Sequence, residues 1–194
     1  MTYAAPPGML RACIEALRAA GGLDRVIVVD NGGRAEVAVD DTAVIGVELL
    51  HTDNRGYGAA ANAGFARARE LGADHIALLN DDVEVRPGWA EALVAELVDG
   101  VGAAQPVVLV AGTDPPVVNS LGVAIGADGA GTDLGDGDPA PPTDAPVSDL
   151  SVFTGGAVMF TVAFLDATGG FDERWFLYYE DVDLCFRVRQ AGWS

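Results

Sequence analysis

The chain has 194 residues, half of them hydrophobic, and a formal net charge of -18 from 11 Lys and Arg against 29 Asp and Glu. This length predicts one domain that can bury a core. The acidic balance argues against nucleic-acid binding, because phosphate backbones are gripped by basic patches. No apolar run approaches the roughly 20 residues of a membrane span. With no signal-peptide pattern and only two cysteines, the protein is expected to be intracellular.

The first part of the chain alternates helices with apolar strands. Apolar residues on one helical face predict a helix over 9–20, and the β-branched run 26–29 predicts a buried parallel strand that ends at Asp30. A weaker pattern at 44–50 predicts another short strand. An Ala-rich helix is expected over 57–71, and its small residues allow close packing on a sheet.

The next strand stops at adjacent carboxylates. The apolar run 76–79 is followed directly by Asn80, Asp81 and Asp82. Ligands of open α/β sheets bind beyond the carboxyl ends of the strands. Two neighbouring carboxylates there attract a hard divalent cation that carries phosphate oxygens. A polar turn after a strand is the alternative, because Asn and Asp are common in turns, and these residues alone leave both open.

The middle of the chain continues the alternation and then loses it. A strand is expected over 104–110, and the repeated order predicts an α/β fold with a mainly parallel sheet flanked by helices. The Gly/Pro/Asp-rich stretch 126–149 is expected to form an acidic surface loop or a locally disordered insertion. The helix before the strand is expected to face inward with Trp89, Leu93, Val94, Leu97 and Val98.

The C-terminal part contains two further features that suggest a site. The strand-like stretch 152–162 includes Gly155 and Gly156, and glycines inside a strand indicate a bulge or a close approach by a ligand. An aromatic run at 175–179 precedes Glu180 and Asp181, and a final helix opens at Asp181. Acids in a first helical turn interact favourably with the helix dipole, so capping is the alternative to catalysis.

Taken together, the motifs resemble the family 2 glycosyltransferases of the GT-A fold, particularly their rhamnosyltransferase-like branch. Each motif is weak alone, whereas their order and spacing are specific. The resemblance extends from Thr2 to Trp193 and implies one partial GT-A domain over 1–194. The motifs are Val29 to Gly32, Asn54 to Gly58 with Asn62 to Gly64, Leu79 to Asp82, Gly155 to Ala157, and Gly169 to Glu173 running into Tyr179 to Leu184.

The resemblance implies inverting transfer of a sugar, with rhamnose as the first guess, from a nucleoside-diphosphate sugar to a glycan or lipid-linked acceptor in cell-wall or polysaccharide synthesis. Asp81 and Asp82 then belong to a variant DXD motif that holds Mg²⁺ or Mn²⁺ against the diphosphate, with Asp82 as the preferred direct ligand. Residues expected around the nucleotide sugar are Thr2, Tyr3, Asp30, Asn54, Arg55, Gly58, Asn80 and Asp81.

On the acceptor side, Glu180 and Asp181 resemble the family's ED motif, in which the Asp acts as general base. Gly155, Gly156 and Trp175 are expected to line the acceptor. Such enzymes work at the cytoplasmic face of the membrane. The resemblance therefore implies a cytoplasmic protein with peripheral contact to the inner face of the plasma membrane, while the oligomeric state is left open.

The chain departs from the family pattern at both ends. The family's first strand, which carries the nucleobase pocket, is largely missing, and only Thr2 and Tyr3 resemble its end. The chain also stops at Ser194, before the region where many members place a metal-binding histidine. A catalytically inactive nucleotide-sugar-binding fragment of such an enzyme is therefore the alternative expectation.

Overall fold

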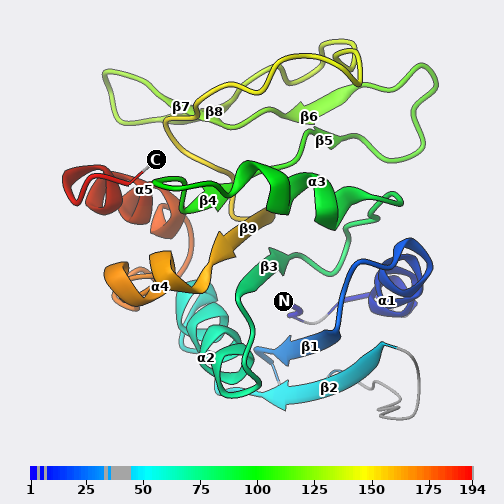
Figure 1. Cartoon of the computed structure of the whole chain (residues 1–194), viewed down its shortest axis with the longest axis vertical. Helices are drawn as coiled ribbons and strands as arrows, with labels where there is room; N and C mark the ends of the chain where they lie inside the picture. The colour runs from blue at the N-terminus through cyan, green and yellow to red at the C-terminus, as the bar shows by residue number, and fades with distance from the viewer. Residues whose placement is uncertain (4, 7, 33–34, 36–44, 194) are drawn as a thin grey trace.

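The computed structural model describes residues 1–3, 5–6, 8–32, 35 and 45–193. Helices and strands alternate in the first half of the chain, which confirms the expected α/β class (Figure 1). The helices are α1 (Met9–Ala20), α2 (Tyr57–Glu70), α3 (Trp89–Glu96), α4 (Val162–Thr168) and α5 (Glu180–Gln190). The strands are β1 (Arg25–Asp30), β2 (Gly46–His51), β3 (His75–Leu79), β4 (Ala103–Ala104), β5 (Val108–Leu109), β6 (Val118–Ser120), β7 (Val123–Ile125), β8 (Gly131–Asp133) and β9 (Ala157–Thr161).

The strands pair in both directions. β1 and β2 are parallel, with Asp30 opposite His51. β9 lies between β3 and β4 and is antiparallel to both, with Leu79 opposite Ala157. The short pairs β5–β6 and β7–β8 are antiparallel and lie at one end of the molecule, at the top of Figure 1. Because β9 runs against β3, the start of β9 meets the carboxyl end of β3.

The close packing predicted for α2 is present. A Cβ added at Gly64 would lie 2.9 Å from Cγ2 of Val29 in β1, so the glycine allows the helix to approach the strand closely. The same helix buries Ala61 and Phe65. Helix α1 follows its predicted bounds and ends at Gly21, whose φ of 71° suits glycine.

The main hydrophobic core is centred on β9. The side chain of Phe160 is fully buried, and its ring lies 5.6 Å from that of Phe65, 5.3 Å from that of Phe153 and 5.7 Å from that of Phe164. Such aromatic pairs add to the free energy of apolar burial. Leu184 of α5 packs in the same core. The core therefore fixes the start of α5 relative to β3 and β9.

The prediction of a single strand over 104–110 is wrong. The structure has two short strands there, and they belong to different sheets: β4 pairs with β9, and β5 pairs with β6. Gln105, Pro106 and Val107 separate them. Proline lacks the N–H that a strand ladder needs, so the run of apolar residues does not continue as one strand.

The predicted inward face of α3 is partly wrong. Val94 and Val98 are 39% and 61% exposed, whereas Ala90 and Leu93 are buried. The helix ends at Glu96, so Val98 lies beyond the helical face on which it was counted. The buried face is narrower than the apolar composition indicates.

The acidic stretch 126–149 lies largely at the surface and contains one strand that its composition does not indicate. β8 pairs with β7, with Ile125 opposite Gly131. Asp128 accepts a hydrogen bond from the Ala130 amide in the turn between them. Of the strand predicted over 44–50, Val44 lies outside the described residues, and the observed strand begins at Gly46.

Residues at the N-terminus stand between β1 and β3. Thr2 bridges to Asp30 in parallel, and the Met1 ammonium donates to the Leu79 carbonyl at 2.7 Å. Burial lowers the pKa of that ammonium, and Asp81 opposes the shift. Behind these two residues a cavity of about 640 Å³ lies between the two strands and is lined also by α1, α2 and α3. Among the described strands, β1 and β3 belong to separate sheets.

Candidate active site

The carboxyl end of β3, the segment before β9 and the start of α5 meet at one edge of the sheet. The Asn80 amide donates to the Gly156 carbonyl at 3.0 Å, which extends the β3–β9 ladder by one bond. Asn80 and Asp81 therefore lie beside Gly155 and Gly156, although 76 positions of sequence separate Asn80 from Gly156. This juxtaposition brings the two predicted halves of the site together.

Asp181 is held by two backbone amides. Its Oδ1 accepts from Val182 at 2.8 Å, and its Oδ2 accepts from Gly155 at 3.1 Å. The bond from Val182 is local to the helix start. The bond from Gly155 comes from the segment before β9, so Asp181 also faces the sheet edge at which β3 ends.

Glu180 differs from its neighbour. Its side chain is 6% exposed, and its Oε2 is buried without a hydrogen-bond partner in the described structure. Burial raises the pKa of Glu180. Burial disfavours the charged form of this carboxyl group, and its buried position leaves it little access to a bound substrate.

Tyr57 connects the segments of the site. Its hydroxyl donates to the Gly155 carbonyl at 2.6 Å and lies 3.1 Å from Oδ1 of Asn80. Desolvation raises the pKa of Tyr57 well above its usual value, and the nearby Glu180 carboxyl adds to the shift. The hydroxyl therefore keeps its proton and remains a hydrogen-bond donor.

A cleft of about 390 Å³ opens beside this edge. It brings together five residues that the sequence predicts for the nucleotide sugar: Thr2, Tyr3, Asn54, Asn80 and Asp81. The remaining lining residues are Met1, Asn31, Gly56, Tyr57, Phe176 and Leu177. The lining thus combines polar groups, from the asparagines and Asp81, with the apolar residues Phe176 and Leu177.

Three residues predicted for the nucleotide lie outside the lining of this cleft. Asp30 is 1% exposed, and its carboxylate accepts from the Gly32 and Ala35 amides at 3.0 and 2.8 Å, so it holds the turn after β1. Arg55 makes an exposed ion pair with Glu173 at 2.8 Å. Gly58 packs inward, where an added Cβ would lie 2.9 Å from Cβ of Phe171.

The predicted metal ligands are at the rim of the site. Asp81 is partly exposed and lines the cleft, and Asp82 is exposed. In the part of the chain that the structure describes, no group of three His, Cys, Asp or Glu side chains gathers as a metal site. Two carboxylates fit a hard divalent ion that takes its other ligands from phosphate oxygens and water.

Trp175 is the outermost predicted acceptor residue. Its side chain is 43% exposed, and its ring lies 6.4 Å from that of Tyr179. Phe176 and Leu177, which sequence reasoning missed, line the cleft instead. Asn31 and Tyr57 were also missed. Both stand inside motifs that the sequence singled out, next to Asp30 and Gly58, so the motif pattern was the available signal.

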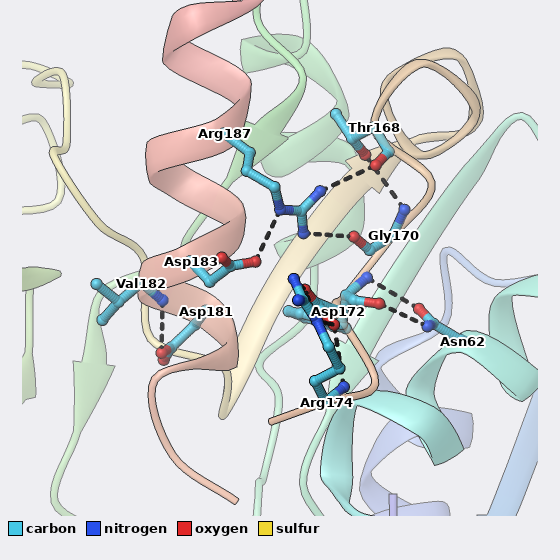
Figure 2. Close-up of polar contacts among 10 residues, drawn as sticks. Asn62, Thr168, Gly170, Asp172, Arg174, Asp181, Val182, Asp183 and Arg187 are labelled. Atoms are coloured by element: carbon cyan, nitrogen blue, oxygen red, sulfur yellow. Dashed lines mark hydrogen bonds and ion pairs between the residues drawn. The ribbon is translucent and has the colours of Figure 1, made fainter. Parts of the chain in front are cut away.

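A network of hydrogen bonds fixes the loop before α5 (Figure 2). The Arg187 guanidinium donates to Oδ2 of Asp183 at 2.7 Å and to the carbonyls of Thr168 and Gly170 at 2.9 and 2.8 Å. On the other side of the loop, Asn62 of α2 bonds to the backbone of Phe171. The start of α5, which carries Asp181, is therefore tied to both α4 and α2.

The geometry defines an α/β protein with a cleft at a strand end that Asp81 helps to line, and solved structures share this fold. A mannosyltransferase from Pyrobaculum calidifontis in complex with GDP-Man and Mn²⁺ superposes with a TM-score of 0.61 at 16% identity, covering 99% of this chain and 51% of that chain. GalNAc-T7 with UDP, GalNAc and Mn²⁺ gives a TM-score of 0.58 at 16% identity, covering 76% of this chain and 30% of that chain. These neighbours support the GT-A fold.

Sequence comparison places the chain in a family. The profile described as Glycosyl transferase family 2 matches residues 1–120, and the chain belongs to this family. A pre-mycofactocin glycosyltransferase of Mycobacterium tuberculosis is 35% identical over 193 residues, which cover 94% of this chain and 37% of that protein. An N-acetylglucosaminyl-diphospho-decaprenol L-rhamnosyltransferase of the same organism is 30% identical over 224 residues, covering 100% of this chain and 70% of that protein. The chain thus spans a little over a third of the first of these relatives.

Proposed function

We propose that this chain forms the donor half and the base of an inverting glycosyltransferase site. The observation that carries the proposal is the hydrogen bond from Gly155 to Asp181, because it holds the carboxylate beside the end of β3, where Asp81 and Asp82 follow. Asp181 on one side and Asp81 with Asp82 on the other therefore lie in different environments at one sheet edge. A displacement needs two such groups, because negative charge grows on the leaving group while the attacking hydroxyl loses a proton.

In the proposed reaction the acceptor oxygen attacks the anomeric carbon while the bond to the leaving diphosphate oxygen breaks. Asp181 takes the proton of the attacking hydroxyl, and such general-base assistance is typically worth about 10²- to 10⁴-fold. Mg²⁺ or Mn²⁺ held by Asp81 and Asp82 supplies stabilisation of the negative charge that grows on the diphosphate. Asp82 is the proposed direct ligand.

The donor is proposed to be a nucleoside-diphosphate sugar. Thr2, Tyr3 and Asn54 line the cleft next to Asn80 and offer hydroxyl, ring and amide groups to a nucleotide. A rhamnose donor is the first to test, because one relative is named an L-rhamnosyltransferase. The two structural neighbours were solved with Mn²⁺ and UDP or GDP-Man, which supports a metal-bound diphosphate.

The acceptor is proposed to be a glycan or a lipid-linked sugar. Trp175, Phe176 and Leu177 are 43%, 57% and 52% exposed, which leaves an apolar surface beside the cleft. Such a surface suits a lipid-linked acceptor at the inner face of the membrane. The proposed membrane contact is peripheral. No helix in the described parts of the chain has the length and apolar content to cross a membrane.

A donor screen tests the proposal. The purified chain is mixed with nucleoside-diphosphate sugars, a lipid-linked sugar acceptor and Mn²⁺, with or without a chelator, and release of nucleoside diphosphate is measured. The proposal predicts metal-dependent release with at least one donor. Metal-dependent nucleotide binding without release would instead support an inactive binding fragment.

A further inference from the structure

The hydroxyl of Tyr57 contacts both halves of the proposed site. It donates to the Gly155 carbonyl at 2.6 Å across 98 positions of sequence and lies 3.1 Å from Oδ1 of Asn80. The Gly155 amide in turn donates to Oδ2 of Asp181 at 3.1 Å. Both backbone polar groups of Gly155 are therefore engaged, the carbonyl by Tyr57 and the amide by Asp181.

The Tyr57 side chain is itself held in place. Its backbone amide donates to the Phe176 carbonyl at 2.9 Å, and its ring packs edge-on against Phe171 with centroids 6.5 Å apart and planes at 69°. These contacts fix where the hydroxyl lies. Burial of the hydroxyl raises the pKa of Tyr57, so the group stays a donor over the range in which proteins fold.

Gly155 lies between its two partners and is buried. An added Cβ would lie 3.6 Å from Oδ2 of Asp181 and 3.7 Å from Cε1 of Tyr57, which are ordinary contact distances, so steric contact does not hold the glycine. The two hydrogen bonds of its backbone therefore connect Tyr57 with Asp181.

We propose that Tyr57 is a positioning residue for Asp181, which acts by holding the Gly155 backbone so that its amide fixes the carboxylate beside the end of β3. The inference rests on the function proposed above and deepens it. Tyr57 does not touch the reacting atoms in this arrangement. Its effect on turnover passes through Gly155 and Asp181.

The first test needs no enzymatic activity. Amide hydrogen exchange at Gly155 and Val182 is measured by NMR in the full chain and in Tyr57→Phe. We expect exchange at Gly155 to become about tenfold faster, as for the loss of one hydrogen bond, while Val182 is unchanged because its bond is local to α5. Equal exchange at Gly155 in both proteins would overturn the inference.

Tyr179→Phe is the matched control. It also removes a tyrosine hydroxyl that donates to a backbone carbonyl, that of Gly129 at 3.2 Å, and it lies next to α5. We expect Gly155 exchange in this variant to equal that of the unmodified chain. A change as large as that in Tyr57→Phe would mean that any lost hydroxyl near α5 loosens the segment, and would overturn the specific role of Tyr57.

The second test is a double-mutant cycle on nucleoside-diphosphate release. Tyr57→Phe is expected to lower kcat about 10- to 100-fold and to change the Kd of the Mn²⁺-bound nucleotide less than about threefold. In an Asp181→Asn background, Tyr57→Phe should lower kcat less than about twofold, because the carboxylate that Tyr57 positions is already replaced. Equal losses in both backgrounds would overturn the inference. If the unmodified chain releases no nucleoside diphosphate but amide exchange at Gly155 changes as expected, only the proposed function is contradicted.

Discussion

Asn62 and Phe171 form two hydrogen bonds with each other, although 109 positions separate them (Figure 2). The Nδ2 of Asn62 donates to the Phe171 carbonyl at 2.9 Å, and the Phe171 amide donates to the Oδ1 of Asn62 at 3.0 Å. The side-chain amide thus pairs with the backbone as a neighbouring strand would. This pairing fixes the loop that leads to α5.

Loss of this pairing should destabilise the protein. Asn62→Ala removes both bonds, and we expect a cost of about 2 kcal/mol and a fall in Tm of about 4–8 °C. Asn119→Ala, at an exposed asparagine, is the control and should cost less than about 0.5 kcal/mol. Chemical denaturation with a circular dichroism signal measures both. Equal midpoints for the two variants would contradict the role of Asn62.

Gly56 should tolerate no side chain. Its φ is 108°, and an added Cβ would lie 2.4 Å from the Phe176 carbonyl oxygen. Gly72 is the matched control, because its φ is also positive, at 81°, but nothing lies near its Cβ position. We expect Gly72→Ala to cost about 1 kcal/mol and Gly56→Ala at least about 3 kcal/mol in urea unfolding. A similar cost at both positions would rule out the steric contact with Phe176.

Glu180 should make stability depend on pH. Its folded pKa is raised above the ordinary value of 4.5 by burial, so folding loses stability as pH rises from 4.5 through the raised folded pKa. Glu180→Gln removes that loss. Its Tm should match the unmodified chain near pH 4 and exceed it near pH 8. The exposed Glu96→Gln is the control and should leave the difference between the two pH values unchanged. A difference in Tm between Glu180→Gln and the unmodified chain that is the same at both pH values would contradict the raised pKa of Glu180.

The cavity between β1 and β3 should accept a strand. Thr2 already pairs with β1 in parallel, and Met1 already donates to the end of β3. Adding five apolar residues before Met1 would continue this pairing along β1 and bury them on both faces. We expect Tm to rise by several degrees and the buried thiol of Cys13, which lines the cavity, to react more slowly with a small reagent. An extension with alternating prolines is the control, and equal Tm values would contradict the expectation.

Much of the local structure was predictable, because it depends on short-range pattern. The apolar period gave α1, β1, α2 and β3 within one or two residues of their observed bounds. The antiparallel insertion of β9 was not predictable in this way, because pairing direction depends on segments distant in sequence. The break at Pro106 was visible in the sequence but was outweighed by its apolar neighbours.

The candidate site was predictable as motifs and less so as contacts. Asn54, Asn80 and Asp81 do line one cleft, as their motif positions indicate. The link from Tyr57 through Gly155 to Asp181 joins residues 98 and 26 positions apart, and no local pattern carries that information. The motifs predicted which segments form the cleft. The contact of Tyr57 with Gly155 is visible only in the folded structure.

Metal binding can be separated from catalysis. If Asp81 and Asp82 hold the ion, Asp82→Asn should weaken Mn²⁺-dependent binding of a nucleoside diphosphate at least about tenfold, because a carboxylate ligand is lost. Asp99→Asn, at an exposed aspartate beyond α3, is the control. Calorimetry with and without Mn²⁺ gives both affinities. If the unmodified chain binds the nucleoside diphosphate equally well with and without Mn²⁺, the proposed role of these carboxylates is wrong.

The central claim is that Asp181 is the base of a sugar transfer at the end of β3. The most direct measurement compares the full chain with Asp181→Asn for release of nucleoside diphosphate in the presence of donor, acceptor and Mn²⁺. The claim predicts a loss of at least about 10²-fold in kcat with the nucleotide Kd nearly unchanged. Turnover by Asp181→Asn equal to that of the unmodified chain would contradict it.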